Sequence, residues 1–166
     1  LSDIEYSDFI SNTKIDEISE FLGSNLLSLS KMLLLEKKII VFSETASLVS
    51  QFMIGIITLF PGSILFTHNP DGKMKSYIDW INRLGLPLKL FNSKTLFLPA
   101  ASIRDLKKLE KAEGYFIGTT NSFFLQNPGL KGDLYINIDE QTVSFTDKKL
   151  KDIVWHHTQH EYEILK

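Results

Sequence analysis

Apolar positions in residues 15–35 recur at steps of three and four, the spacing of an amphipathic helix. The positions in question are Ile15, Ile18, Phe21, Leu22, Leu26, Leu29, Met32 and Leu33. Gly23 and Ser24 interrupt this pattern, because glycine and serine are weak helix formers. The sequence therefore predicts one or two helices, with the break at this pair.

The next segment is continuously apolar rather than periodic. Ile39–Phe42 are all β-branched or aromatic, which is typical of a strand covered on both faces, as in a parallel sheet. A wide apolar stripe over residues 48–60 then predicts a helix of about four turns, with Ser43 or Thr45 as its cap. Residues 63–66 form a second short apolar run, so the order strand, helix, strand predicts a right-handed crossover unit.

Helical and strand patterns continue to alternate through the rest of the chain. Further strands are expected at residues 95–99, 115–117, 133–139 and 142–145, and further helices at residues 74–84, 103–112, after Asn121, and at 147–155. This alternation predicts an α/β fold. We expect a central mixed, partly parallel sheet, flanked by helices on both faces, in a single lobe.

Charge and composition exclude several classes of function. The 166 residues carry 18 Lys and Arg against 20 Asp and Glu, so the net charge of -2 gives no electrostatic attraction to nucleic acid or anionic lipid. We expect no nucleic-acid partner and at most peripheral membrane association. The absence of cysteine excludes disulfides, a thiol nucleophile and a cysteine metal site. No apolar stretch approaches the roughly 20 residues of a membrane span, and residues 1–20 do not resemble a secretory signal.

The turn Gly118-Thr119-Thr120-Asn121 is a candidate phosphate-binding loop. A nucleotide loop of the Walker type closes with Lys and Ser or Thr, and the dinucleotide fingerprint needs three spaced glycines. Only one glycine and no lysine are present here. We interpret the turn as structural: Gly118 adopts a backbone conformation that other residues resist, and Asn121 caps the following helix.

The same turn has a second property, which is its position after a strand. Functional loops of α/β proteins lie at the carboxyl ends of the strands. Ser43 and Glu44 follow one predicted strand, and Thr119, Thr120 and Asn121 follow another. We therefore expect these five residues to share one rim of the sheet and to be candidates for contact with a partner.

The three histidines near the end of the chain, His156, His157 and His160, are candidate metal ligands. On a helix, His156 and His160 would lie on one face, a spacing that suits zinc. The metalloprotease pattern, however, needs Glu directly after the first His, and His157 stands there. We prefer a solvated terminal helix, or histidines that pack on another part of the full-length protein. The sequence contains no nucleophile elbow and no cysteine, so we predict no catalytic residue, no metal and no cofactor.

An ordered set of segments resembles a known family. The segments are "LLLEKKIIVFS" (33–43), "LFPG" (59–62), "LGLPLKLF" (84–91), "IRDLKKL" (103–109), "FIGTTNSFFLQ" (116–126) and "DLYINID" (133–139). In this order, over residues 22–153, they resemble the central block of DENN domains. The details are most similar to the branch named for late secretory pathway transport proteins.

The resemblance implies both an architecture and a function. Residues 1–166 would form the α/β lobe of a two-lobed module, without a counterpart of its longin-like N-terminal lobe. Family members act in vesicle trafficking, many as guanine nucleotide exchange factors for Rab GTPases. Such factors work without covalent chemistry, by stabilising the nucleotide-free GTPase. The implied partners are a small GTPase and the protein's own N-terminal lobe. The implied location is the cytoplasm, with recruitment to secretory or endosomal membranes.

Two alternatives remain open from the residues alone. The chain can be a structural lobe without exchange activity, which only packs on its own N-terminal lobe. It can also be a small-molecule or nucleotide-binding α/β domain whose ligand lies at the carboxyl edge of the sheet.

Overall fold

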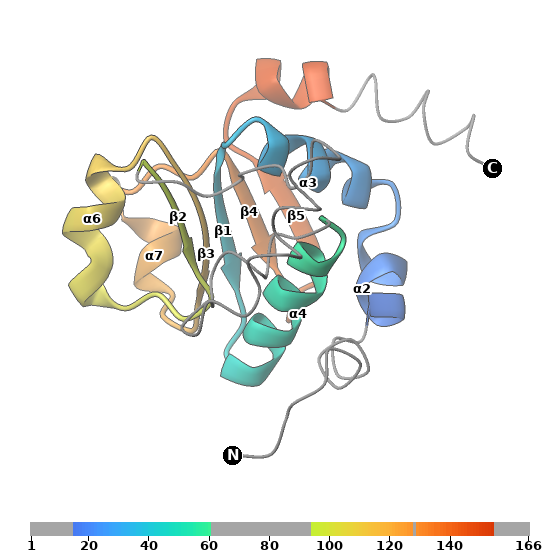
Figure 1. The fold of residues 1–166 in the computed structure, drawn as a ribbon, viewed down its shortest axis with the longest axis horizontal. Coiled ribbons are helices and arrows are strands. Elements are labelled where there is room, and N and C mark those ends of the chain that lie inside the picture. Colours follow the sequence, from blue (N-terminus) through green and yellow to red (C-terminus); the bar gives the residue numbers. More distant parts are fainter. Residues whose placement is uncertain (1–14, 61–93, 128, 155–166) are drawn as a thin grey trace, which may run out of the picture.

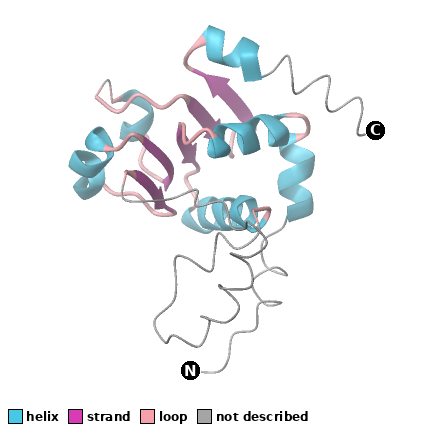
Figure 2. Ribbon diagram, turned by 45° about the horizontal axis from the view of Figure 1, so that its top comes forward, coloured by secondary structure: helices cyan, strands magenta, loops and turns pink. Residues whose placement is uncertain are grey.

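The computed structural model describes residues 15–60, 94–127 and 129–154. These residues form a five-stranded sheet in the order β2-β3-β1-β4-β5. Helices lie on both sides of the sheet (Figures 1 and 2). The predicted fold class is confirmed: a mixed α/β fold in which a mostly parallel sheet is enclosed by helices.

The strands are β1 (Lys38–Phe42), β2 (Thr95–Leu98), β3 (Gly114–Thr119), β4 (Leu134–Asn137) and β5 (Thr142–Phe145). The helices are α2 (Ile15–Leu22), α3 (Asn25–Leu34), α4 (Ala46–Thr58), the 3-10 helix η1 (Ile103–Asp105), α6 (Leu106–Lys111) and α7 (Phe123–Gln126). Residues 148–154 are also helical.

β1 is the centre of the sheet. It pairs in parallel with β3 on one side and with β4 on the other, while β2 pairs in parallel with β3. β5 returns antiparallel beside β4, as the short turn between them requires. In this register Phe42 lies opposite both Thr119 and Asn137, so the carboxyl ends of β1, β3 and β4 meet at one edge.

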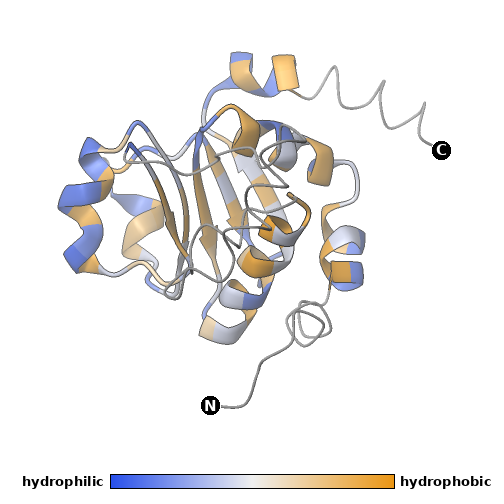
Figure 3. Cartoon of the chain, viewed as in Figure 1, coloured by the Kyte–Doolittle hydropathy of each residue, from blue (hydrophilic) through white to orange (hydrophobic). Residues whose placement is uncertain are grey.

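Two apolar cores enclose the sheet. β1 contributes Ile39 and Val41 to the core under α2, α3 and α4, and Ile40 to the core under α6 and α7. This alternation explains why the strand is continuously apolar: both of its faces are covered. On α6, which covers the second core, Figure 3 shows both hydrophobic and hydrophilic residues.

The predicted break near residue 23 is confirmed and has a backbone cause. Gly23 has a φ of +49°, in the left-handed region that favours glycine after a helix. Its amide donates to the carbonyl of Ser19 at 2.8 Å and ends α2. α3 then begins at Asn25 and continues to Leu34.

The predicted reason for a glycine at position 118, an unusual backbone conformation, was wrong. The φ of Gly118 is not in the left-handed region, so the backbone conformation does not demand glycine. The demand is for space: a Cβ at this position would lie 2.3 Å from Cγ1 of Val49 and 2.6 Å from the carbonyl oxygen of Pro99. Gly118 is required because α4 and residue 99 approach β3 closely.

The predicted cap of α7 makes its bond, whereas the predicted caps of α4 do not bond to the helix. Thr45 occupies the N-cap position of α4, but its side chain makes no capping bond. The hydroxyl of Ser43 accepts from the amide of Thr45 before the helix begins. At α7, Ser122 occupies the N-cap position without a side-chain capping bond, and the side chain of Asn121, the predicted cap, accepts from the amide of Phe123.

Several predictions lie outside the described residues. They include the strand at 63–66, the helix at 74–84 and the crossover unit that depends on them. Among the helices that the structure describes, none has both the length and the apolar character needed to cross a bilayer.

Candidate functional site: a strand-end rim and an adjacent groove

The carboxyl ends of β1, β3 and β4 form a polar edge, here called the strand-end rim. It comprises Ser43, Glu44, Thr119, Thr120, Asn121 and Asp139. The amide of Ser43 donates to the carbonyl of Thr119 at 3.4 Å, which continues the β1–β3 pairing beyond the strands. The structure thus brings together the two segments that the sequence placed on one rim.

Asp139 holds the β1 side of the rim. Its Oδ1 accepts from the hydroxyl of Ser43 at 2.7 Å, and its Oδ2 accepts from the amide of Glu44 at 2.7 Å. The Ser43 hydroxyl in turn accepts from the amide of Thr45 at 3.0 Å. Bonds to a carboxylate are stronger than bonds between neutral groups, so Asp139 fixes the loop that leads into α4.

Thr119 and Asn121 hold the β3 side in the same way. The hydroxyl of Thr119 accepts from the amide of Asn121 at 3.1 Å and donates to the carbonyl of Ala101 at 3.4 Å. The side-chain oxygen of Asn121 accepts from the amide of Phe123 at 3.0 Å. These local bonds give the turn its shape and start α7.

Burial divides the five candidate residues into two groups. Ser43 and Thr119 are buried, and their side chains are engaged within the chain. Glu44, Thr120 and Asn121 are exposed. If this rim contacts a partner, the exposed three supply the side chains, while the buried pair positions the loops that carry them.

The rim is poorly suited to a phosphate. Phosphate sites use free backbone amides and positive charge. Here the amides of Glu44, Thr45 and Asn121 already donate to side chains of the rim. The carboxylate of Asp139 also adds a negative charge at the same place. This arrangement opposes the nucleotide-binding alternative.

No group of three potential metal ligands is present within residues 15–60, 94–127 and 129–154. The histidines considered for zinc, His156, His157 and His160, lie outside the described residues. The disfavoured zinc site at these histidines is therefore not tested by the structure and stays a hypothesis from the sequence.

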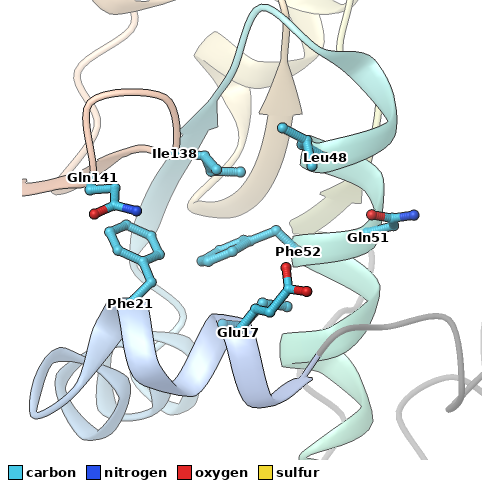
Figure 4. A pocket seen from close by; sticks show the side chains of 8 residues that line it. Glu17, Phe21, Leu48, Gln51, Phe52, Ile138 and Gln141 are labelled. Carbon is cyan, nitrogen blue, oxygen red and sulfur yellow. The ribbon is translucent and has the colours of Figure 1, made fainter.

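A groove lies beside the rim, and sequence reasoning did not find it. It has a volume of about 150 Å³ and is bounded by α2, α4 and the turn between β4 and β5 (Figure 4). Its lining residues are Glu17, Ile18, Phe21, Leu48, Gln51, Phe52, Ile138 and Gln141. The rings of Phe21 and Phe52 are tilted by 55° with their centroids 6.2 Å apart.

Asp139 was also missed, although a signal for it existed. It is the last residue of the predicted strand 133–139, so the strand-end argument applied to Ser43 applies to it as well. The sequence does not show which strands are neighbours in the sheet. The structure places β4 beside β1, in the order β3-β1-β4, and this brings Asp139 to Ser43.

Fold and rim together define a mixed α/β domain whose strand-end loops are held by its own side chains and border an apolar groove. The profile of the transport protein Avl9 family matches residues 2–162. The chain belongs to the Avl9 family. The predicted similarity to late secretory pathway transport proteins is thereby confirmed at the level of the family, and the wider DENN resemblance stays a prediction.

Two curated relatives are similar to most of this chain. The late secretory pathway protein AVL9 of Saccharomyces cerevisiae is 25% identical over 150 residues, covering 78% of this chain and 19% of the relative. The late secretory pathway protein avl9 of Schizosaccharomyces pombe is 24% identical over 149 residues, covering 78% and 31%. The chain spans less than a third of the length of either relative.

Proposed function

We propose that this chain is a protein-binding lobe of a regulator of late secretory transport, and that its partner is a small GTPase of the Rab type. Family membership and the names of the two relatives support the transport role. The observation that carries the binding role is the rim, where a buried, hydrogen-bonded base presents exposed Glu44, Thr120 and Asn121.

The proposed mechanism needs no bond to be made or broken by this chain. A regulator that binds the nucleotide-free GTPase more tightly than the loaded one lowers nucleotide affinity by the same coupling energy. A rim held by side-chain hydrogen bonds suits this task, since a preorganised surface loses little conformational entropy on binding. The DENN resemblance, with its exchange activity, supports the same proposal.

A nucleotide-exchange assay with the full-length protein tests the proposed function. We expect the protein to accelerate release of a fluorescent GDP from at least one member of a panel of Rab-type GTPases, by about 5- to 150-fold. The double variant Glu44→Lys with Thr120→Arg should reduce that acceleration about tenfold, because it changes the charge and bulk of the exposed rim. Glu110→Lys is the matched control, since Glu110 is an exposed acid on α6.

The result that overturns the proposal is equally definite. It fails if no panel member responds, or if the rim variant and the α6 control behave alike. A rise in the melting temperature of this chain on addition of GDP or ATP alone would instead favour the nucleotide-binding alternative.

A second candidate is packing of this lobe on the preceding part of its own protein. Leu34 and Leu35, at the end of α3, and Ile153, in the helix of residues 148–154, are large apolar side chains exposed to solvent. Such side chains often mark contact surfaces when they occur together.

A further inference from the structure

The groove between α2, α4 and the β4–β5 turn has the size of a single large side chain. Its volume is about 150 Å³, and an apolar cavity of roughly that volume holds one benzene molecule. Phe21, Phe52 and Ile138 form its apolar wall, as Figure 4 shows. Leu48 also lines it and is 37% exposed, so the apolar wall reaches solvent.

The segments that border the groove carry negative charge and no positive charge. α2 carries Asp16, Glu17 and Glu20, and the turn after β4 carries Asp139 and Glu140. Residues 15–22, 44–58 and 137–145 contain no lysine, arginine or histidine. The asymmetry is local, because the whole chain has a net charge of only -2.

We propose that this groove binds a basic protein segment, which inserts one large apolar side chain and places lysines or arginines against the acidic border. A pocketed apolar anchor surrounded by charge complementarity is the arrangement that gives binding hot spots their affinity and specificity. Anionic lipid and nucleic acid are repelled by the same border. The inference goes beyond the proposed function: it concerns the groove rather than the strand-end rim, and it holds whichever partner the rim has.

A peptide array tests the proposed chemistry directly. The immobilised peptides have Phe, Leu, Met, Ala or Asp at their centre, and flanks of Lys, Ser or Glu. The probe is the full chain carrying a fluorescent label. We expect binding only where a large apolar centre is combined with Lys flanks, and about tenfold less signal when the centre is Ala. Raising the salt concentration should weaken the signal, because the border charges lie near solvent.

Two variants assign the binding to the groove. Leu48→Lys puts a positive charge on its exposed wall and should reduce the array signal about tenfold. Ile103→Lys is the control, since Ile103 is 58% exposed and lies in η1, beside α6. If Leu48→Lys lowers the melting temperature, Gln51→Lys, a partly buried polar position lining the same groove, provides the measurement instead.

Each other outcome overturns the inference. Equal binding to Glu-flanked peptides would exclude charge complementarity, and equal binding with Ala at the centre would exclude the anchor. Retention of the signal by both groove variants would place the site elsewhere. Binding of the chain to phosphatidylserine vesicles through Leu48 would make the occupant a membrane. Absence of any array signal, with loss of stability in both groove variants, would mean that another part of this chain fills the groove. None of these readouts involves a GTPase, so they are independent of the exchange assay.

Discussion

Two polar side chains, one at the strand-end rim and one in a core, differ in whether their oxygen atoms are hydrogen-bonded. At the rim, both carboxylate oxygens of Asp139 accept hydrogen bonds. In the core under α6 and α7, the hydroxyl of Tyr115 is buried and has no hydrogen-bond partner among the residues that the structure describes. The ring of Tyr115 lies 5.7 Å from the Lys38 ammonium, a cation–π distance. The two residues should therefore respond oppositely to loss of their polar groups.

Asp139→Asn is expected to destabilise the domain by about 1–2 kcal/mol. An amide offers one acceptor oxygen in place of two and no charge, so either Ser43 or Glu44 loses its partner. The measurement is the free energy of unfolding in urea. Glu140→Gln is the control, because Glu140 is the neighbouring exposed acid and its carboxylate takes no part in these bonds. Equal stability of the two variants would contradict the structural role of Asp139.

Tyr115→Phe is expected to leave stability unchanged or to raise it by up to about 1 kcal/mol, because it removes a buried hydroxyl that bonds to no residue in the described part of the chain. Tyr135→Phe is the matched comparison. Its hydroxyl accepts from the amide of Gly132 at 2.9 Å and donates to the carbonyl of Leu130 at 3.4 Å, so its loss should cost about 1 kcal/mol. A larger loss for Tyr115→Phe than for Tyr135→Phe would refute the assignment.

Tyr115 also predicts a pH dependence. Burial raises the pKa of its phenol above the usual value, with the nearby Tyr135 and Asp133 adding to the shift. The neutral phenol is therefore favoured in the folded state. Its contribution to stability is present below the unfolded pKa of about 10 and is lost as the pH rises through the higher folded pKa. Urea midpoints of the wild type should fall more than those of Tyr115→Phe between neutral and strongly alkaline pH. Parallel curves would contradict the prediction.

At the scale of elements, the packing of α4 on β3 decides how the rim is built. α4 starts directly after the rim and crosses β3 at Gly118, where Val49 and Met53 approach the backbone. The carbonyl of Gly118 accepts from the amide of Ala101 at 2.7 Å, which ties residues 99–101 to the same point. The close approach and the rim therefore depend on one another.

Gly118→Ala should destabilise the domain by about 1–3 kcal/mol, as overpacking of a core does. The new Cβ would lie under 3 Å from the Val49 and Met53 side chains and from the carbonyl oxygen of Pro99, and a backbone oxygen cannot move aside cheaply. Gly129→Ala is the control, since its Cβ would meet only the ends of the Asn127 and Glu110 side chains, at 3.3 and 3.4 Å. Thermal melting of both variants measures the difference. Similar melting temperatures would show that the contact can relax.

At the scale of the whole molecule, charge and apolar exposure are distributed unevenly. The border of the groove is acidic, whereas α6 carries Lys107, Lys108 and Lys111. The end of α3 presents Leu34 and Leu35 to solvent. Because the chain spans less than a third of its curated relatives, surfaces of this kind are natural places for contact with the remainder of the protein.

Replacing Leu34 and Leu35 together by Ser separates a contact role from a folding role. In this chain alone, the unfolding free energy should change by no more than about 0.5 kcal/mol, since both side chains are exposed. In the full-length protein, the same change should increase cleavage by protease around this lobe. Ile103→Ser, exposed beside α6, should have neither effect. Unchanged protection of the full-length variant would exclude this surface from contact with the rest of the protein.

The sequence by itself determined the elements and the class of fold. Apolar residues spaced three and four positions apart predicted α2, α3 and α4. The continuous apolar run at Ile39–Phe42 predicted β1 as a strand covered on both faces. These features are local: a residue's helical or strand preference and the side it buries are set by neighbours a few positions away. The same rule placed Ser43 and Thr119 at strand ends, and the structure brings them together.

Only the tertiary structure decided what those strand ends do. The strand order puts β4 beside β1, so Asp139 reaches Ser43 and Glu44 across 95 or more positions of sequence. The need for glycine at residue 118 comes from a helix that packs on it, and the groove exists only where α2, α4 and the β4–β5 turn meet. Such contacts join residues that are far apart along the chain, so patterns among near neighbours predicted the elements but neither the groove nor the bonds of Asp139 to Ser43 and Glu44.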